Sequence, residues 1–184
     1  MTQNISQTVI AKRCNIYIYK LQAETISSCL FFKGEAMDRE YYMNKALELA
    51  REAYEADEVP VGCVIADKDG NIIATGRNRR EETNDACAHA ELEAIRTACE
   101  RVGDWRLSEC SIYVTLEPCP MCAGGIINSR IPNVVYGAKD ENTGSCGSVI
   151  NLFEERYGHK PAVYGGVKAD ECGKILKEFF EKKR

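Results

Sequence analysis

Apolar residues recur every three or four positions shortly after residue 37, as expected for one face of a helix. Asp38 favours a helix start, and the pattern continues to about residue 56. We therefore predict a helix over 38–56 with one face in the core. Its apolar positions are Met43, Ala46, Leu47, Ala50, Ala53 and Tyr54.

Short runs rich in β-branched and apolar residues follow this helix and predict strands. Val61–Asp67 and Ile72–Arg77 flank the turn Lys68-Asp69-Gly70-Asn71, so we expect them to form a hairpin. A polar loop is expected from Asn78 to Asp85. Further strands are predicted at Ser111–Leu116, Asn133–Ala138 and, as a short segment, Ala162–Tyr164.

Helical patterns alternate with these strands. They are predicted at about Ala88–Val102, Cys119–Ser129, Val149–Glu155 and Ala169–Glu181. The strand-helix-strand unit over 111–138 implies a right-handed crossover and a parallel pair of strands. The expected fold is a three-layer α/β/α domain with helices on both faces of a mixed central sheet.

The first 36 residues differ in composition from the rest. They hold four basic and two acidic residues and so carry a net charge of +2. Because the whole chain carries −4, residues 37–184 carry −6. We expect 1–36 to be a poorly ordered extension, with a short strand or helix in the alternating stretch Asn15–Lys20. Met37 directly precedes the first predicted helix and is a candidate natural start. We therefore divide the chain into this extension and a domain over 37–184.

Length, charge and cysteine usage limit the class of protein. A chain of 184 residues accommodates one full-sized domain, and it shows neither a secretory signal nor a membrane span. Its ten cysteines are scattered and suggest no disulfide framework, so we expect a cytoplasmic protein with reduced thiols that are free to hold metal.

The net charge of −4 argues against a general polyanion binder, so any contact with nucleic acid must be local. Two basic clusters are candidates, although a solvated surface explains either one alone. They are Arg77, Arg79 and Arg80, and Lys182, Lys183 and Arg184.

Two short motifs together supply three metal ligands and one carboxylate. Cys119 and Cys122 are spaced to share one face at a helix start, where free N–H groups favour thiolates. His89 and Glu91 can reach the same site only if the histidine lies at the extreme N-terminus of its helix. Two thiolates and one imidazole would leave the fourth position of Zn²⁺ open for water. His-x-Glu followed by Pro-Cys-x-x-Cys is the signature of zinc-dependent deaminases.

Simpler interpretations exist for each part of this pattern. An isolated Cys-x-x-Cys pair is most often a structural zinc site, a redox pair or a coincidence, and the joint pattern argues against all three. His159 is interpreted as a surface loop residue. Cys87, two positions before His89, would close the metal site if it supplied another sulfur; we expect it to stay out.

Beyond the metal motif, residues 115–131 closely resemble bacterial tRNA-specific adenosine deaminases. Further segments agree: Val59-Pro60-Val61-Gly62, Gly76-Arg77-Asn78, Ala88-His89-Ala90-Glu91, and Tyr136–Asp140 with Thr143-Gly144. The resemblance covers about residues 38–184. It implies the cytidine-deaminase fold, a homodimer with one Zn²⁺ per subunit, and conversion of adenosine to inosine at the wobble position of a tRNA anticodon stem-loop.

The resemblance also implies roles for individual residues. Glu91 would carry protons between water and the adenine ring, Asn78 would contact the target nucleoside, and Asp140 lies in the segment that approaches the RNA. One departure is Asp85-Ala86-Cys87, where the family commonly has Asp-Pro-Thr, so we expect a more flexible loop. Zinc would be held by His89, Cys119 and Cys122.

Phe179 and Phe180 are adjacent in the last predicted helix, so they cannot both face the core. An exposed ring beside the C-terminal cations would form a platform of the kind that holds unpaired RNA bases. We therefore include both phenylalanines as candidate substrate-binding residues, against the alternative of a core phenylalanine and a solvated basic tail.

Other functions share parts of this pattern. A free-base or nucleoside deaminase acting on guanine or cytosine carries the same metal motif. A deaminase of riboflavin synthesis is disfavoured because no chain remains for its usual reductase domain. A catalytically inert zinc-binding interaction module is disfavoured by Glu91, since a structural site has no need of an acid outside the ligand set.

Overall fold

The computed structural model describes residues 39–184, which form one compact unit. The predicted extension over 1–36, its alternating stretch and the candidate start Met37 lie outside the described residues. The first described helix spans 39–55, in agreement with the predicted helix over 38–56.

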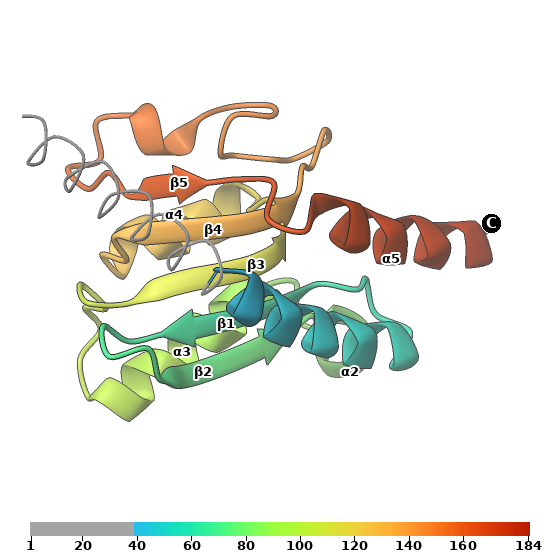
Figure 1. The fold of residues 1–184 in the computed structure, drawn as a ribbon, viewed down its shortest axis with the longest axis horizontal. Coiled ribbons are helices and arrows are strands. Elements are labelled where there is room, and N and C mark those ends of the chain that lie inside the picture. Colours follow the sequence, from blue (N-terminus) through green and yellow to red (C-terminus); the bar gives the residue numbers. More distant parts are fainter. Residues whose placement is uncertain (1–38) are drawn as a thin grey trace, which may run out of the picture. The chain divides into compact units, whose positions relative to one another are not determined.

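A single five-stranded sheet occupies the centre of this unit, in the order β2-β1-β3-β4-β5 (Figure 1). β1 pairs antiparallel with both β2 and β3, whereas β3, β4 and β5 run parallel. The predicted hairpin, parallel pair and mixed sheet are therefore confirmed. The strands are β1 (Gly62–Ala66), β2 (Ile72–Arg77), β3 (Ser111–Leu116), β4 (Asn133–Ala138) and β5 (Ala162–Tyr164).

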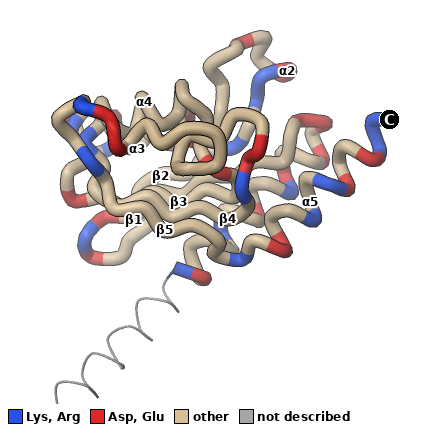
Figure 2. The backbone as a smooth tube through the Cα atoms, turned by 90° about the horizontal axis from the view of Figure 1, so that it is seen from above, with Lys and Arg blue, Asp and Glu red and all other residues tan. Residues whose placement is uncertain are grey.

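Helices cover both faces of the sheet and make the predicted three layers. One face packs against α3 (Ala90–Val102) and α4 (Pro120–Asn128). The other face packs against the 39–55 helix and α5 (Ala169–Lys182). Among the five described strands only β2 carries a charged residue, Arg77. Charged positions concentrate on the loops and helices (Figure 2).

Two glycines allow helices to lie directly on the sheet. A Cβ at Gly62 would come within 2.0 Å of the Ala46 carbonyl oxygen, and one at Gly76 within 2.2 Å of the Ala90 carbonyl oxygen. Any side chain at Gly76 would therefore push the first turn of α3 away from the sheet. Because α3 begins immediately after His89, this close packing helps to place the histidine.

Two predictions of local structure were wrong. The expected loop over 78–85 contains a short helix, α2 (Arg80–Thr83), and the buried Glu58 carboxylate accepts the Glu82 N–H at 2.8 Å within it. The expected helix over 149–155 is a loop with one 3-10 turn, η1 (Leu152–Glu154). The N–H groups of Val149 and Ile150 both bond the Gly144 carbonyl, so they fold back on the preceding turn instead of starting a helix.

Candidate metal centre and its surroundings

The N-termini of α3 and α4 converge at the candidate metal site. His89 is the N-cap of α3, with an extended backbone (φ −84°, ψ 149°), and Cys119 is the N-cap of α4. Pro120 occupies the first turn of α4, where a missing N–H costs nothing. His89 thus has the terminal position that the His-x-Glu spacing requires.

The three predicted ligands lie close enough to share one ion. The ligand atoms of His89, Cys119 and Cys122 all lie within 4.8 Å of one another. His89 Nδ1 is 3.8 Å from Cys119 Sγ and 3.5 Å from Cys122 Sγ. Ordinary Zn–N and Zn–S bonds in a tetrahedron separate N and S by about 3.6 Å, so the donor set fits Zn²⁺ through Nδ1. Cys87 is exposed and lies outside this group, as expected.

Hydrogen bonds and burial inside the triad shift the pKa of all three ligands. A hydrogen bond from Cys122, opposed by burial, lowers the pKa of Cys119 to about 4. The same bond and burial raise the pKa of Cys122, and the bond to Cys119 raises the pKa of His89. Cys119 is therefore a thiolate at neutral pH, and an arriving cation would displace the protons that remain on the other ligands.

Glu91 lies in the first turn of α3 and is only 4% exposed. Burial raises the pKa of its carboxyl to about 7, and the side chain hydrogen-bonds Cys122. Its carboxyl is outside the triad of donor atoms that could share one ion. The site therefore combines three metal ligands with a buried acid that can both hold and release a proton.

Asn78 connects the end of β2 to the start of α3. Its side chain is buried, and its Oδ1 accepts the Ala90 N–H at 3.1 Å. Its own N–H bonds the Val61 carbonyl at 3.2 Å. Within residues 39–184 the amide Nδ2 makes no hydrogen bond, so it remains available to a ligand. The predicted nucleoside contact stays a prediction, and the capping of α3 is a role that sequence analysis missed.

Asp140 organises its own turn. Its Oδ1 accepts the N–H groups of Asn142 and Thr143 at 2.9 and 3.2 Å, and its Oδ2 accepts the Thr143 hydroxyl at 2.6 Å. The turn forms one wall of a groove of about 460 Å³. The groove is lined by Val59, Leu116, Lys139, Asp140, Glu141, Asn142, Leu176 and Phe180. A role for Asp140 in RNA binding therefore remains a prediction that would act through this wall.

The two C-terminal phenylalanines have different environments. Phe179 is 4% exposed and packs edge-on against Tyr54 at 5.7 Å between ring centroids. Phe180 is 49% exposed and lines the groove beside Asp140. The burial of Phe179 does not fit the substrate-binding role predicted for it, because its ring offers no free face. Phe180 keeps that role as a prediction.

Several other candidates have structural partners. Arg77 and Arg79 both pair with Glu82, at 2.9 and 2.7 Å, so the loop arginines are partly neutralised. His159 Nε2 donates to the Ile131 carbonyl at 2.7 Å and fixes its loop.

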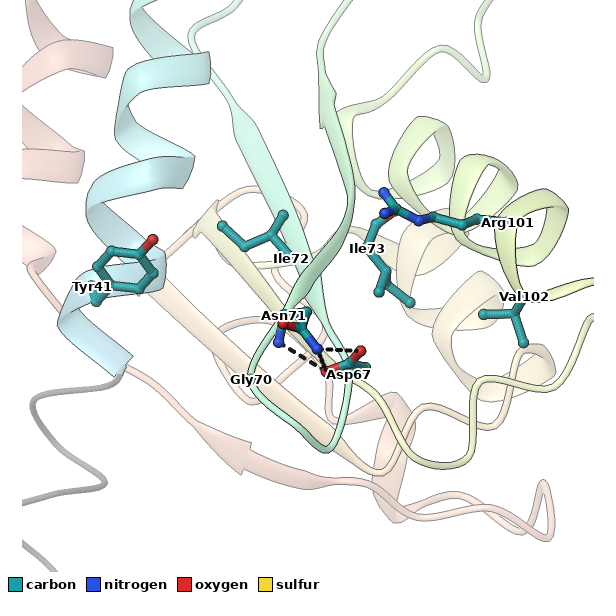
Figure 3. A pocket seen from close by; sticks show the side chains of 8 residues that line it. All are labelled: Tyr41, Asp67, Gly70, Asn71, Ile72, Ile73, Arg101 and Val102. Atoms are coloured by element: carbon teal, nitrogen blue, oxygen red, sulfur yellow. Dashed lines mark hydrogen bonds between the residues drawn. The ribbon is translucent and has the colours of Figure 1, made fainter.

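A second hollow, of about 740 Å³, lies beside the β1–β2 turn (Figure 3). It is lined by Tyr41, Asp67, Gly70, Asn71, Ile72, Ile73, Arg101 and Val102. Arg101 and Val102 are at the C-terminal end of α3, whereas His89 precedes its N-terminus. A 13-residue helix is about 20 Å long, so this hollow is remote from the metal triad.

Two buried carboxylates were missed by sequence analysis. Glu58 and Glu117 are each 2% exposed. Glu58 holds α2, and Glu117 holds the loop that follows β4. The sequence does carry a signal for Glu117, because an acid stands between an apolar strand and the Pro-Cys motif.

Comparison with known proteins identifies the family. Residues 36–138 match the cytidine and deoxycytidylate deaminase zinc-binding region, which is more than half of the chain. The chain belongs to this deaminase family. The zinc-binding assignment of the family agrees with the donor set formed by the three ligands.

Relatives of the deaminase include enzymes named for action on tRNA. It is 46% identical over 146 residues to the tRNA-specific adenosine deaminase of Bacillus subtilis, covering 79% of this chain and 90% of that protein. It is also 46% identical over 138 residues to the tRNA(Ile)-lysidine synthase of Deinococcus radiodurans. That match covers 75% of this chain but only 24% of the longer protein.

Solved structures agree with the fold. One comes from work on A-to-I editing by tRNA:A34 deaminases at the wobble position, with 45% identity and a TM-score of 0.71. The alignment covers 73% of this chain and 98% of that one. A guanine deaminase of Nitrosomonas europaea matches at 25% identity and a TM-score of 0.63, over 76% of this chain and 83% of that one. No helix described within residues 39–184 is long and apolar enough to cross a bilayer.

Proposed function

We propose that the deaminase converts adenosine to inosine at the wobble position of a tRNA anticodon, with one Zn²⁺ bound per subunit. The observation that carries the chemistry is the convergence of two helix N-termini, which places three metal ligands beside a buried acid. The choice of substrate rests on similarity to tRNA-specific adenosine deaminases at 42–46% identity over most of the chain.

In this mechanism His89, Cys119 and Cys122 would hold the metal. A bound Zn²⁺ would supply an open coordination position at which water is activated at neutral pH. Glu91 would accept a proton from the attacking water and deliver it to ring N1 of adenine, and then assist the departure of ammonia. Asn78 would orient the nucleoside through its free Nδ2, while its Oδ1 keeps α3 in place.

Recognition of the RNA would extend beyond the reacting base. An anticodon loop presents unstacked bases, so a target nucleotide can be extruded at low cost. The groove between Asp140 and Phe180 has an exposed aromatic ring for a neighbouring base, and the cation Lys139 on its wall suits a phosphate. These contacts are local, which agrees with a net charge of −4.

The proposal includes a homodimer that acts in the cytoplasm. Support comes from the family resemblance and from exposed apolar side chains such as Val149 and Ile150, at 52% and 45% exposure. Measurement of the molar mass in solution tests the dimer, and a monomer at micromolar concentration would contradict it.

A substrate panel tests the reaction. The zinc-loaded full chain is incubated separately with unmodified tRNAs whose anticodons begin with adenosine, with free adenosine, with guanine and with cytosine, and ammonia release is measured. We expect release from the matching tRNA and none from the small molecules. Release from guanine or cytosine without tRNA deamination would instead assign the chain to the free-base deaminases.

A further inference from the structure

Glu117 is a buried carboxylate at the end of β3 that has no part in the mechanism described above. It follows β3 directly and precedes Pro118 and the ligand Cys119. Its N–H bonds the Ala138 carbonyl at 2.9 Å, which extends the β3–β4 pairing by one step. The carboxyl group is 2% exposed and faces the loop after β4.

Four donors converge on this carboxylate. Oε1 accepts the N–H groups of Cys146 and Ser148 at 2.8 and 3.1 Å. Oε2 accepts the Asp140 N–H at 3.2 Å and the Ser148 hydroxyl. No lysine, arginine or histidine of the described residues pairs with Glu117, and all four donors belong to the loop after β4.

The loop is fitted closely around the carboxylate. A Cβ at Gly144 would come within 2.6 Å of the Glu117 Cδ atom, so only glycine permits this approach. The Ser145 N–H bonds the Pro118 carbonyl at 2.9 Å, which joins the same loop to the turn that carries Cys119. Side chain and backbone thus fix the loop against the metal-ligand turn.

The same loop forms one wall of the groove that Phe180 also lines. Asp140, whose N–H is held by Glu117, lies in that wall with Lys139 and Asn142. Removal of the carboxylate would therefore release the wall without removing a metal ligand. The four donors match a carboxylate, which offers about four acceptor positions and no donor. A glutamine at position 117 would place the two N–H groups of its amide against the N–H and O–H groups of the loop.

We propose that Glu117 is a positioning residue that holds loop 139–148 in the conformation that binds RNA. The effect on RNA rests on the proposed function, whereas the effect on the loop does not. If only a fraction of molecules has the binding conformation, the apparent dissociation constant rises in inverse proportion to that fraction. Loss of one hydrogen bond to an ionised acceptor changes an equilibrium by about one to two orders of magnitude.

The test compares Glu117→Gln with the wild type, using the zinc-loaded full chain. Amide hydrogen exchange over 139–148 should accelerate at least about tenfold, while exchange in α3 and the zinc content stay unchanged. KM for an anticodon stem-loop should rise about tenfold, with kcat within about threefold of the wild type. Glu155→Gln, which removes an exposed carboxylate on the neighbouring loop, serves as the control and should alter none of these values.

A milder variant keeps the proposal testable if Glu117→Gln fails to fold. Ser148→Ala removes one of the four donors, and it should produce a smaller acceleration confined to the same loop. Unchanged exchange over 139–148 in both variants would overturn the proposal. A fall in kcat and zinc content with an unchanged KM would also overturn it, since Glu117 would then position the metal-ligand turn. If the wild type forms no inosine, the proposed function fails, and hydrogen exchange still decides the role of Glu117.

Discussion

Asn78 offers a direct test of how the fold builds the site, because its side chain caps α3 one residue after His89. Asn78→Ala removes the acceptor of the Ala90 N–H, which is a buried bond of 3.1 Å. An orphaned buried donor costs about 1–3 kcal/mol. In a folded unit of 146 residues (39–184) this corresponds to a fall in melting temperature of about 3–10 °C.

The assay is urea and thermal unfolding at one fixed free zinc concentration, since metal binding itself stabilises the folded state. Asn128→Ala is the matched control, because Asn128 is exposed at the end of α4 and its loss should change stability by less than about 0.5 kcal/mol. Asn78→Ala should also reduce deamination of the anticodon stem-loop beyond the loss of folded protein. An Asn78→Ala protein that melts within a degree of the wild type would refute the capping argument.

Phe180→Ala should weaken tRNA binding by about 1–3 kcal/mol and leave the free energy of unfolding unchanged, because its ring is exposed. Phe179→Ala should lower the free energy of unfolding by about 3–5 kcal/mol, because its ring is buried. If both variants weakened binding equally and neither changed stability, this assignment of the two rings would be wrong. X-ray absorption should detect two sulfurs and one nitrogen around zinc in the wild type and in Cys87→Ser, and a third sulfur that disappears in Cys87→Ser would show a closed site. Deletion of residues 1–36 should leave activity and melting temperature nearly unchanged, and insolubility of the shortened protein would contradict this expectation.

Most helices and strands could be predicted from the sequence, because the spacing of apolar residues shows which positions are buried. β3 and β4 were predicted to the residue, since both are apolar runs bounded by polar or turn residues. The irregular segments depend on contacts that periodicity does not encode. α2 is held by a carboxylate 24 positions earlier in the chain, and Val149 and Ile150 fold back on Gly144.

The site was predictable to a similar degree. The metal ligands follow a fixed spacing at helix starts, so the sequence alone indicated which residues would meet. The contacts of Glu117 beside these ligands could not be predicted from the sequence, because its hydrogen-bond partners lie 23 to 31 positions away in the chain. The sequence also could not show which of Phe179 and Phe180 is buried. Both are phenylalanines in one helix, and they differ only in the direction that each side chain faces.

The proposed deamination of adenosine in tRNA depends on a buried acid, Glu91, beside three metal ligands. Glu91→Gln tests this dependence, because the amide preserves the shape of the side chain and removes its capacity to carry a proton. Metal analysis and inosine at the wobble position are measured on the same preparation of wild type and variant. We predict equal zinc content and a loss of deamination of at least about 100-fold in Glu91→Gln. Inosine formation at the wild-type rate in the variant would show that Glu91 does not carry the proton in this reaction.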